Sequence, residues 1–448
     1  MDLLIEKGDK RTYLSRYKVI TTSFEESSPS VKRNNTQIQY RNGNVDFGGW
    51  HEAKKIDYVG YYRADDIDEE EVLREKIYAL LSDQDGYYIT QLKNDSDNSY
   101  ERPGENTGDY FEKQVNRPSH KRFYVYASSL ESELVGSYGG HVLYKISATF
   151  TTMKLPYGES VPRDLDVKPN VPYIGDNLYT DTKNFDNLES WYTSNYWTKN
   201  TDTYKGLAVL QTTANWKGLS QYIQVKKGDI LTYSVYAKNI SGTGNSNIYW
   251  ALSTSPEGSY SSATSSPTNS TVAITDSWQR VSGTTVATSD GYLRPRLERS
   301  DGNTNTLQVS GIKVEKGSVP TPYSPAPSDA EYNAWYTKFY YNTDNLVIPY
   351  AGTVPCNQLE QGFTIEFTAK EGGSGLKVNL NGTELTYSGQ VYSGDVVKLS
   401  GYEYTKNDIS IVELTNKAYF KLIPGITNEI SSNLHGSIKI LGFQDLYA

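Results

Sequence analysis

The middle of the chain holds aromatic and cationic side chains with the chemistry that sugar recognition needs. Sugars present apolar C–H faces and rings of hydroxyls, so a sugar site combines flat aromatic rings with planar hydrogen-bonding groups. Arginine adds fork-shaped hydrogen bonding, which suits anionic or phosphate-bearing polysaccharides. The residues that we predict to bind carbohydrate are Trp197, Trp216, Tyr236, Lys238, Tyr249, Tyr292, Arg294 and Arg296.

Alternation along predicted strands turns most of these side chains toward solvent. With Leu231 and Tyr233 facing a core, Tyr236 and Lys238 point outward. With Leu293 and Leu297 facing the core, the outward side chains are Tyr292, Arg294 and Arg296. Tyr249 alternates with Ile248 and Trp250, so one of these two faces is exposed. Trp197 and Trp216 lie in turn-rich segments and are expected to form the rim.

The chain offers little for catalysis. Its histidines are scattered without metal-ligand spacing, at His51, His120, His141 and His435. No nucleophile elbow, P-loop or dinucleotide-binding glycine motif occurs in the right context. The acidic run in residues 65–71 begins a helix, where the dipole favours carboxylates, so we interpret it as capping. We predict no enzymatic activity, no catalytic or metal-ligating residue and no cofactor.

Composition favours sheets and argues against nucleic-acid and membrane partners. The 39 tyrosines suit pleated, half-buried surfaces. A net charge of -9 disfavours nucleic acid, because phosphate contacts need clustered Lys and Arg. No stretch reaches the roughly 18–20 apolar residues of a membrane span.

The start of the chain lacks a secretory-signal pattern, so we expect synthesis and assembly in a cytoplasm. The single Cys356 excludes an intrachain disulfide and is expected to be buried.

Two proline-rich stretches divide the chain into three predicted domains. Prolines between 156 and 172 and between 320 and 327 predict stiff connectors. The domains are therefore 1–163, 176–320 and 334–448, in a multidomain and mainly β protein. The first is predicted to be α+β with an exposed arm at 93–119, and the second a β-sandwich with a Ser/Thr-rich loop at 253–270. The third is predicted to be all β, without a helix of useful length.

Short sequence motifs predict a few individual secondary-structure elements. Asp68, with Glu71 three residues later, predicts the start of a helix, and its apolar face is Leu73, Ile77, Leu80 and Leu81. Asn381-Gly382 predicts a hairpin between 376–380 and 384–387. Trp278 is predicted to be a core residue, whereas Trp191 and Trp250 are equally compatible with core and site.

The middle segment resembles a broad family of carbohydrate-binding modules, which implies a jelly-roll-like β-sandwich. The resemblance lies in 225–238 (VKKGDILTYSVYAK), 278–280 (WQR), 311–318 (GIKVEKGS) and 321–325 (TPYSP). Tyr323 stands where that family usually has Trp. The family often carries a structural calcium ion, but the resemblance identifies no ligand residues for it in this chain.

The flanking domains resemble the two halves of a siphophage distal tail protein. Residues 56–62 (IDYVGYY) and 79–82 (ALLS) are similar to its ring-forming belt domain. Its galectin-like domain is matched by 341–344 (YNTD), 394–397 (GDVV), 420–428 (FKLIPGITN) and 442–447 (GFQDLY). Taken together, the chain resembles the evolved type of this family, with an inserted carbohydrate-binding module.

This resemblance implies a place and a set of partners. The place is the virion tail tip, or baseplate, where a homohexameric ring joins the tail tube to the adhesion apparatus. The implied partners are further copies of the chain, the major tail protein, the tape measure protein, a tail-associated adhesin or lysin, and a host cell-wall saccharide used in adsorption. Two alternatives remain: a polysaccharide-degrading enzyme with an ancillary sugar-binding module, and a purely architectural tail protein.

Overall fold

The protein is mainly β and multidomain in a computed structural model that describes residues 1–94, 116–256 and 270–448. It divides into two compact units. Unit 1 combines Met1–Lys168 with Thr343–Ala448, and unit 2 is Pro169–Asn342. The middle unit therefore extends beyond the predicted 176–320 at both ends. No helix in the described ranges is long and apolar enough to span a bilayer.

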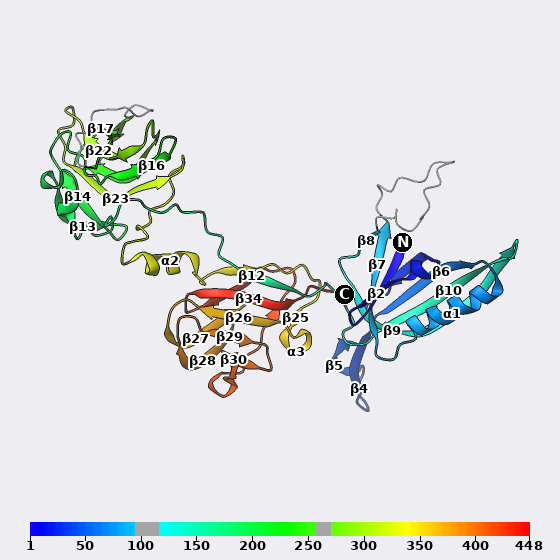
Figure 1. Ribbon diagram of the computed structural model, residues 1–448. Helices are drawn as coiled ribbons and strands as arrows, with labels where there is room; N and C mark the ends of the chain where they lie inside the picture. The colour runs from blue at the N-terminus through cyan, green and yellow to red at the C-terminus, as the bar shows by residue number, and fades with distance from the viewer. Residues whose placement is uncertain (95–115, 257–269) are drawn as a thin grey trace. The chain divides into compact units, whose positions relative to one another are not determined.

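The N-terminal half of unit 1 is an antiparallel sheet of eight strands covered by one helix (Figure 1). The order is β2-β1-β7-β9-β10-β6-β3, with β8 paired to β7. The bounds are β1 Asp2–Lys7, β2 Lys10–Tyr13, β3 Val19–Glu26, β6 Lys55–Ala64, β7 Tyr87–Asn94, β8 Asn116–Pro118, β9 Phe123–Tyr138 and β10 His141–Thr152, with a 3-10 turn at Leu14–Tyr17. The predicted arm at 93–119 falls largely outside the described residues.

The helix α1 spans Ile67–Leu81, but it begins earlier than predicted. Asp66, not Asp68, is the N-cap, and its Oδ1 accepts the Glu69 amide at 2.7 Å. Leu73 and Ile77 are buried as the apolar spacing predicts. The error arose because several neighbouring acids satisfy the same capping pattern.

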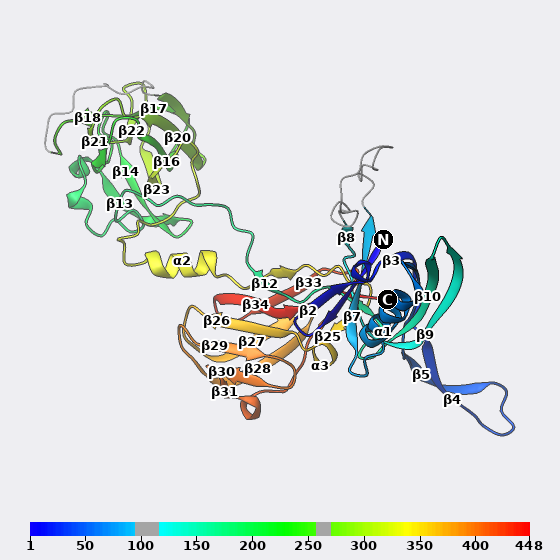
Figure 2. The same cartoon turned by 45° about the vertical axis from the view of Figure 1, so that its right-hand side comes forward.

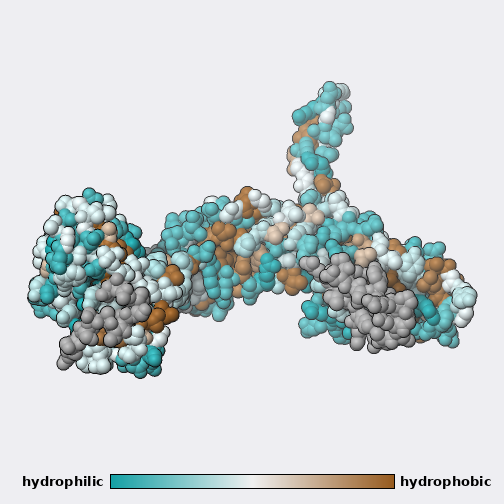
Figure 3. All heavy atoms as spheres, turned by 90° about the horizontal axis from the view of Figure 1, so that it is seen from above, coloured by the Kyte–Doolittle hydropathy of each residue, from teal (hydrophilic) through white to brown (hydrophobic). Residues whose placement is uncertain are grey.

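A two-stranded hairpin projects from this sheet (Figure 2). Its strands, β4 (Val31–Gln37) and β5 (Asn44–His51), flank a turn that holds Asn42 and Gly43. It exposes large apolar side chains, with Tyr40 99%, Phe47 65% and Trp50 53% exposed. Figure 3 shows brown, apolar atoms among the hydrophilic ones along it.

The C-terminal half of unit 1 is a sandwich around its own core. One sheet has the order β12-β34-β26-β29-β30-β31 and the other β24-β33-β27-β28. The bounds are β11 Gly158–Glu159, β12 Arg163–Val167, β24 Leu346–Ile348, β25 Cys356–Asn357, α3 Gln358–Gln361, β26 Thr364–Ala369, β27 Gly373–Leu380, β28 Thr383–Val391, β29 Val396–Leu399, β30 Tyr404–Lys406, β31 Ile409–Ser410, β32 Lys421–Leu422, β33 Asn428–Ser432, β34 Gly436–Phe443 and β35 Leu446–Tyr447, with a 3-10 turn at Val412–Leu414. The predicted hairpin at Asn381-Gly382 is confirmed.

Unit 2 is a β-sandwich followed by a helix. A five-stranded sheet, β13-β14-β23-β16-β20, faces two three-stranded sheets, β15-β21-β18 and β19-β17-β22, and their inward residues form one core cluster. The bounds are β13 Thr198–Tyr204, β14 Leu207–Thr212, β15 Ile223–Val225, β16 Ile230–Asn239, β17 Gly244–Tyr249, β18 Leu252–Ser253, β19 Ser270–Ile274, β20 Gln279–Val286, β21 Gly291–Leu293, β22 Arg296–Arg299 and β23 Leu307–Lys316, with 3-10 turns at Leu188–Ser190 and Ser194–Tyr196. Most of the predicted 253–270 loop lies outside the described residues.

The helix α2 (Tyr332–Tyr340) was not predicted, because only strands were expected in this region. Its aromatic residues have high strand propensity. Their spacing nevertheless suits a helix, since Trp335 stacks on Phe339, four residues later, with ring centroids 5.4 Å apart.

Candidate functional site

The two small sheets of unit 2 carry four of the eight predicted residues on their outer surface. Ile248 and Leu297 face the core, so Tyr249 and Arg296 face outward, as predicted. The Arg296 guanidinium lies 4.7 Å from the centre of the Tyr249 ring. Its Nε donates to the Glu298 carboxylate at 2.6 Å. Arg296 is thus neutralised within the sheet, with only 12% of its side chain exposed.

Next to this pair, a cavity of about 400 Å³ opens on the surface. It is lined by Ser190, Trp191, Tyr192, Ser220, Gln221, Tyr222 and Arg294. Arg294 was expected to be exposed but is 8% exposed, because it lies 4.1 Å from the Tyr192 ring centre. Its Nη2 also donates to the Pro256 carbonyl at 3.0 Å.

The cavity is held by the core beneath it. Trp191 is 2% exposed, and its ring meets Tyr179 edge-on, with centroids 5.4 Å apart. A β-bridge joins Tyr192 to Ser220, which brings two distant segments to one wall. Tyr222, which also lines the cavity, packs edge-on against the predicted Tyr292, with ring centroids 5.8 Å apart.

The two tryptophans predicted to lie at the rim differ in exposure. Trp216 is 43% exposed in a left-handed backbone conformation, with its Nε1 donating to Asp301 at 2.7 Å. Trp197 is only 5% exposed, and its Nε1 donates to the Lys217 carbonyl at 2.6 Å. The expectation that Trp197 lies at the rim is wrong, because its position in a turn does not prevent its ring from entering the core.

Tyr236 and Lys238 lie on the opposite outer face, that of the five-stranded sheet. There Tyr204 meets the Tyr236 ring at 5.2 Å and stacks on Trp278 at 4.4 Å, while Lys238 lies 5.3 Å from the Trp278 ring. Trp278 is therefore half-buried on this face, not in the core as predicted. Burial works to raise the pKa of Tyr236, but hydrogen bonding to and the charges of Arg280 and Lys205 together lower that pKa below its ordinary value.

The structure thus does not bring all eight predicted residues together. Tyr249, Tyr292, Arg294 and Arg296 share one face, whereas Tyr236 and Lys238 share the other. Sequence reasoning missed Tyr192 and Tyr222, which are 50% and 52% exposed at the cavity. Strand parity offered a signal for Tyr222, since Val225 in the following strand is buried. Trp191 and Trp250, left open by the sequence, are both in the core.

The metal-ligating side chains of residues 1–94, 116–256 and 270–448 are dispersed. Within these ranges, no group of three or more His, Cys, Asp or Glu side chains could hold a metal ion. Instead, an internal cation, the Lys313 ammonium, donates to Thr321 Oγ1 at 2.7 Å and to the Pro322 carbonyl at 2.8 Å. It also lies 3.3 Å from the Glu315 carboxylate, with both side chains buried.

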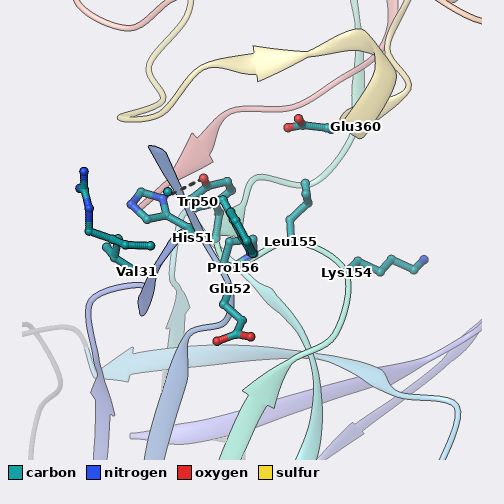
Figure 4. Close-up of a pocket in the computed structure, with 11 residues that line it drawn as sticks. Val31, Trp50, His51, Glu52, Lys154, Leu155, Pro156 and Glu360 are labelled. Carbon is teal, nitrogen blue, oxygen red and sulfur yellow. Dashed lines mark hydrogen bonds between the residues drawn. The ribbon is translucent and has the colours of Figure 1, made fainter. Parts of the chain in front are cut away.

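A second cavity, of about 470 Å³, lies in unit 1 and holds none of the predicted residues (Figure 4). Trp50, Lys154 and Glu360 are among its lining residues. His51 Nδ1 and the Tyr157 hydroxyl are hydrogen-bonded there at 2.9 Å. Charges of both signs surround this cavity, and they indicate no particular ligand.

Comparisons with known proteins complete the description. No family model and no curated protein matches the sequence. Among solved structures, the Dit protein of phage SPP1, described as a hub of the adsorption apparatus of phages that infect Gram-positive hosts, is 9% identical with a TM-score of 0.41, covering 100% of this chain and 99% of its own. The xylan-binding CBM22-1 domain of Paenibacillus barcinonensis Xyn10C is 18% identical with a TM-score of 0.23, covering 33% of this chain and 99% of its own.

A chain from the baseplate of phage p2 is 10% identical with a TM-score of 0.26, covering 70% of this chain and 97% of its own. Of these three structures, two belong to phage adsorption or baseplate assemblies and one is a xylan-binding domain.

Proposed function

We propose that the protein is a non-enzymatic structural hub of a phage tail tip whose middle unit binds a host cell-surface polysaccharide. The observation that carries the proposal is the insertion of unit 2, a sandwich with its own core, between the two halves of unit 1. An inserted module with its own core can be gained without redesign of the protein that receives it.

Unit 1 supports the structural half of the proposal. Its two halves are joined by strands that precede the insertion and pair with the end of the chain. Gly158 pairs with Tyr447 in β11–β35, and β12 extends the C-terminal sheet beside β34. Arg163 adds a 3.2 Å ion pair to Asp445. We infer the homohexameric ring and its tail partners from the sequence resemblance to siphophage distal tail proteins.

Unit 2 supports the binding half of the proposal. Exposed aromatic rings at Tyr192, Tyr222 and Trp216 lie on the outer side of the small sheets or the loops beside them, with guanidinium groups among them. Such surfaces match the C–H faces and hydroxyls of a sugar chain. In a ring, several copies would act together and raise weak contacts to a useful avidity.

The test uses the full chain and a variant in which 169–342 is replaced by a flexible linker. Electron microscopy of both proteins should show the same six-fold rings. Only the full chain, labelled with a fluorophore, should stain whole host cells. Equal staining by both would refute the binding role of unit 2, and monomers in both images would refute the ring. Release of reducing ends from host wall material would favour an enzyme instead.

A further inference from the structure

We propose that a basic and aromatic cluster on the five-stranded sheet of unit 2 selects polysaccharides that carry repeated anionic groups, either carboxylates or phosphate diesters. The cluster consists of Tyr204, Lys205, Tyr236, Lys238 and Trp278. This inference rests on the proposed sugar-binding role of unit 2 and adds a second surface with a defined class of ligand. Three observations support it: the placement of the rings, the cations beside them and the strained turn that holds Lys205.

The rings of the cluster come from opposite edges of the sheet. Tyr204 ends β13 and Trp278 immediately precedes β20, and these two strands are the edges. Their rings nevertheless stack, with centroids 4.4 Å apart and an interplanar angle of 17°. Tyr236 in β16 meets the Tyr204 ring edge-on at 5.2 Å. All three side chains are half-buried, so part of their apolar surface remains open to the C–H faces of a sugar chain.

Two lysines without acidic partners lie beside these rings. The Lys205 ammonium is 4.7 Å from the centre of the Tyr236 ring, and the Lys238 ammonium is 5.3 Å from the centre of the Trp278 ring. In the described part of the chain, no carboxylate lies within 4.0 Å of either ammonium. Lys205 is exposed and Lys238 is half-buried. Both charges are therefore available to an anionic ligand that approaches the rings.

The hydroxyl of Tyr236 reflects the positive field of this surface. Burial acts to raise its pKa, yet hydrogen bonding to and the charges of Arg280 and Lys205 lower that pKa below its ordinary value. Arg280 Nη2 donates to Ser234 Oγ at 2.7 Å and to the Thr321 carbonyl at 2.6 Å, so this group adds charge but is not itself open to a ligand. A positive surface on a chain of net charge -9 favours anionic ligands locally.

The turn that carries Lys205 is strained for a lysine. Lys205 and Gly206 form the two-residue turn between β13 and β14, and their φ angles are 53° and 74°. Such turns favour Asn-Gly, because few residues other than Gly and Asn accept a positive φ at low cost. Strain of this kind is concentrated at functional sites. Here it holds the ammonium within 5.6 Å of the centre of the Tyr204 ring, so we infer that the turn retains lysine for its charge.

Calorimetric titration of the full chain with four defined polymers tests the inference. Hyaluronan offers carboxylates, carboxyl-reduced hyaluronan is its neutral counterpart, poly(glycerol phosphate) offers phosphate diesters, and dextran is an unrelated neutral chain. We expect at least one anionic polymer to bind about tenfold more tightly than both neutral polymers, with an affinity that falls as salt is added. The anionic polymer that binds identifies the source of the charge.

Two lysine substitutions locate the effect. K238Q should weaken binding of the anionic polymer about tenfold, because a charge-assisted contact is lost. K205N should weaken it by a similar factor while raising the unfolding midpoint, since it gives the turn the Asn-Gly pair that such turns favour. A purely structural role of Lys205 would move both measurements in the same direction. K316Q removes a charge from an exposed position elsewhere on the same sheet and should change neither binding nor the midpoint.

The contrary outcomes are distinct. The inference is overturned if neither anionic polymer binds more tightly than the neutral ones, or if the K205N/K238Q double variant keeps the wild-type preference for the anionic polymer. If the full chain still stains host cells in either case, and the variant without 169–342 does not, the proposed sugar-binding role of unit 2 survives with a different ligand. Equal staining by these two proteins overturns the proposed role itself.

Discussion

The ammonium of Lys313 shows how unit 2 accommodates an internal charge. Its side chain is fully buried, and burial lowers its pKa to about 8 against the opposing attraction of Glu315. Thr321 and Pro322 supply oxygen acceptors, so the ammonium has hydrogen-bond partners. Removal of the charge from water nevertheless costs free energy of folding. The unfolded chain binds this proton up to the ordinary lysine value of 10.5.

A pH dependence of stability follows from that difference. Between pH 8 and 9.5 the unfolded state holds the Lys313 proton more tightly than the folded state, so stability should rise with pH, by up to about 2 kcal/mol. Above pH 10 the unfolded tyrosines ionise and reverse the trend, since burial raises the pKa of Tyr179 well above its ordinary value. Urea unfolding followed by tryptophan fluorescence measures this, because six of the seven tryptophans lie in unit 2.

The controls for this experiment are two methionine variants on the same strand. K313M should be less stable near neutral pH, because Glu315 loses its partner, and its stability should be nearly flat from pH 8 to 9.5. K316M removes an exposed lysine and should keep the wild-type slope. The same slope in K313M and the wild type would contradict the assignment.

Single residues also show where sequence reasoning stops. Parity correctly turned Tyr249 and Arg296 away from the core, because a strand alternates regardless of its surroundings. It did not foresee that Glu298 and Tyr192 would cover Arg296 and Arg294. Coverage depends on segments far away in the chain, and one of them holds Tyr192, which the sequence did not single out.

At the scale of elements, helix α1 depends on its N-cap. D66A should lower the free energy of unfolding of the N-terminal sheet domain by about 1 kcal/mol, because the Glu69 amide loses its acceptor. D68A, the cap favoured by the sequence, should cost much less, since Asp68 lies inside the first turn. Hydrogen exchange of residues 67–81 reports this directly. Faster exchange in D68A than in D66A would show that the helix begins at the later residue.

The hairpin of β27 and β28 provides a second test at this scale. Its turn was predictable because Asn381 and Gly382 both adopt positive φ, which few other residue pairs accept. G382A should cost about 1 kcal/mol from backbone strain alone, because nothing lies within 4 Å of the added methyl group. G136A, equally open but without a positive φ, should change stability by less than about 0.5 kcal/mol in the same urea titration. Equal costs would remove the conformational explanation.

At the scale of the whole molecule, the domain order was predictable but the boundaries were not. Prolines marked the connectors, whereas β12 (Arg163–Val167), which begins at the last residue of the predicted first domain, belongs to the C-terminal sheet. Strand pairing across nearly 280 residues leaves no local trace in the sequence. Each of the three domains nevertheless has its own hydrophobic cluster, so the predicted fold class is confirmed.

These separate cores predict that the two units unfold independently. In differential scanning calorimetry, replacement of 169–342 by a flexible linker should remove one transition and leave the midpoint of unit 1 unchanged within about 2 °C. A matched variant that also lacks 163–167 should lower that midpoint, because Arg163, Leu165 and Val167 pair with β34. If removal of unit 2 alone lowers the midpoint as much, the units stabilise each other, and the insertion is part of the structural core rather than an added binding module.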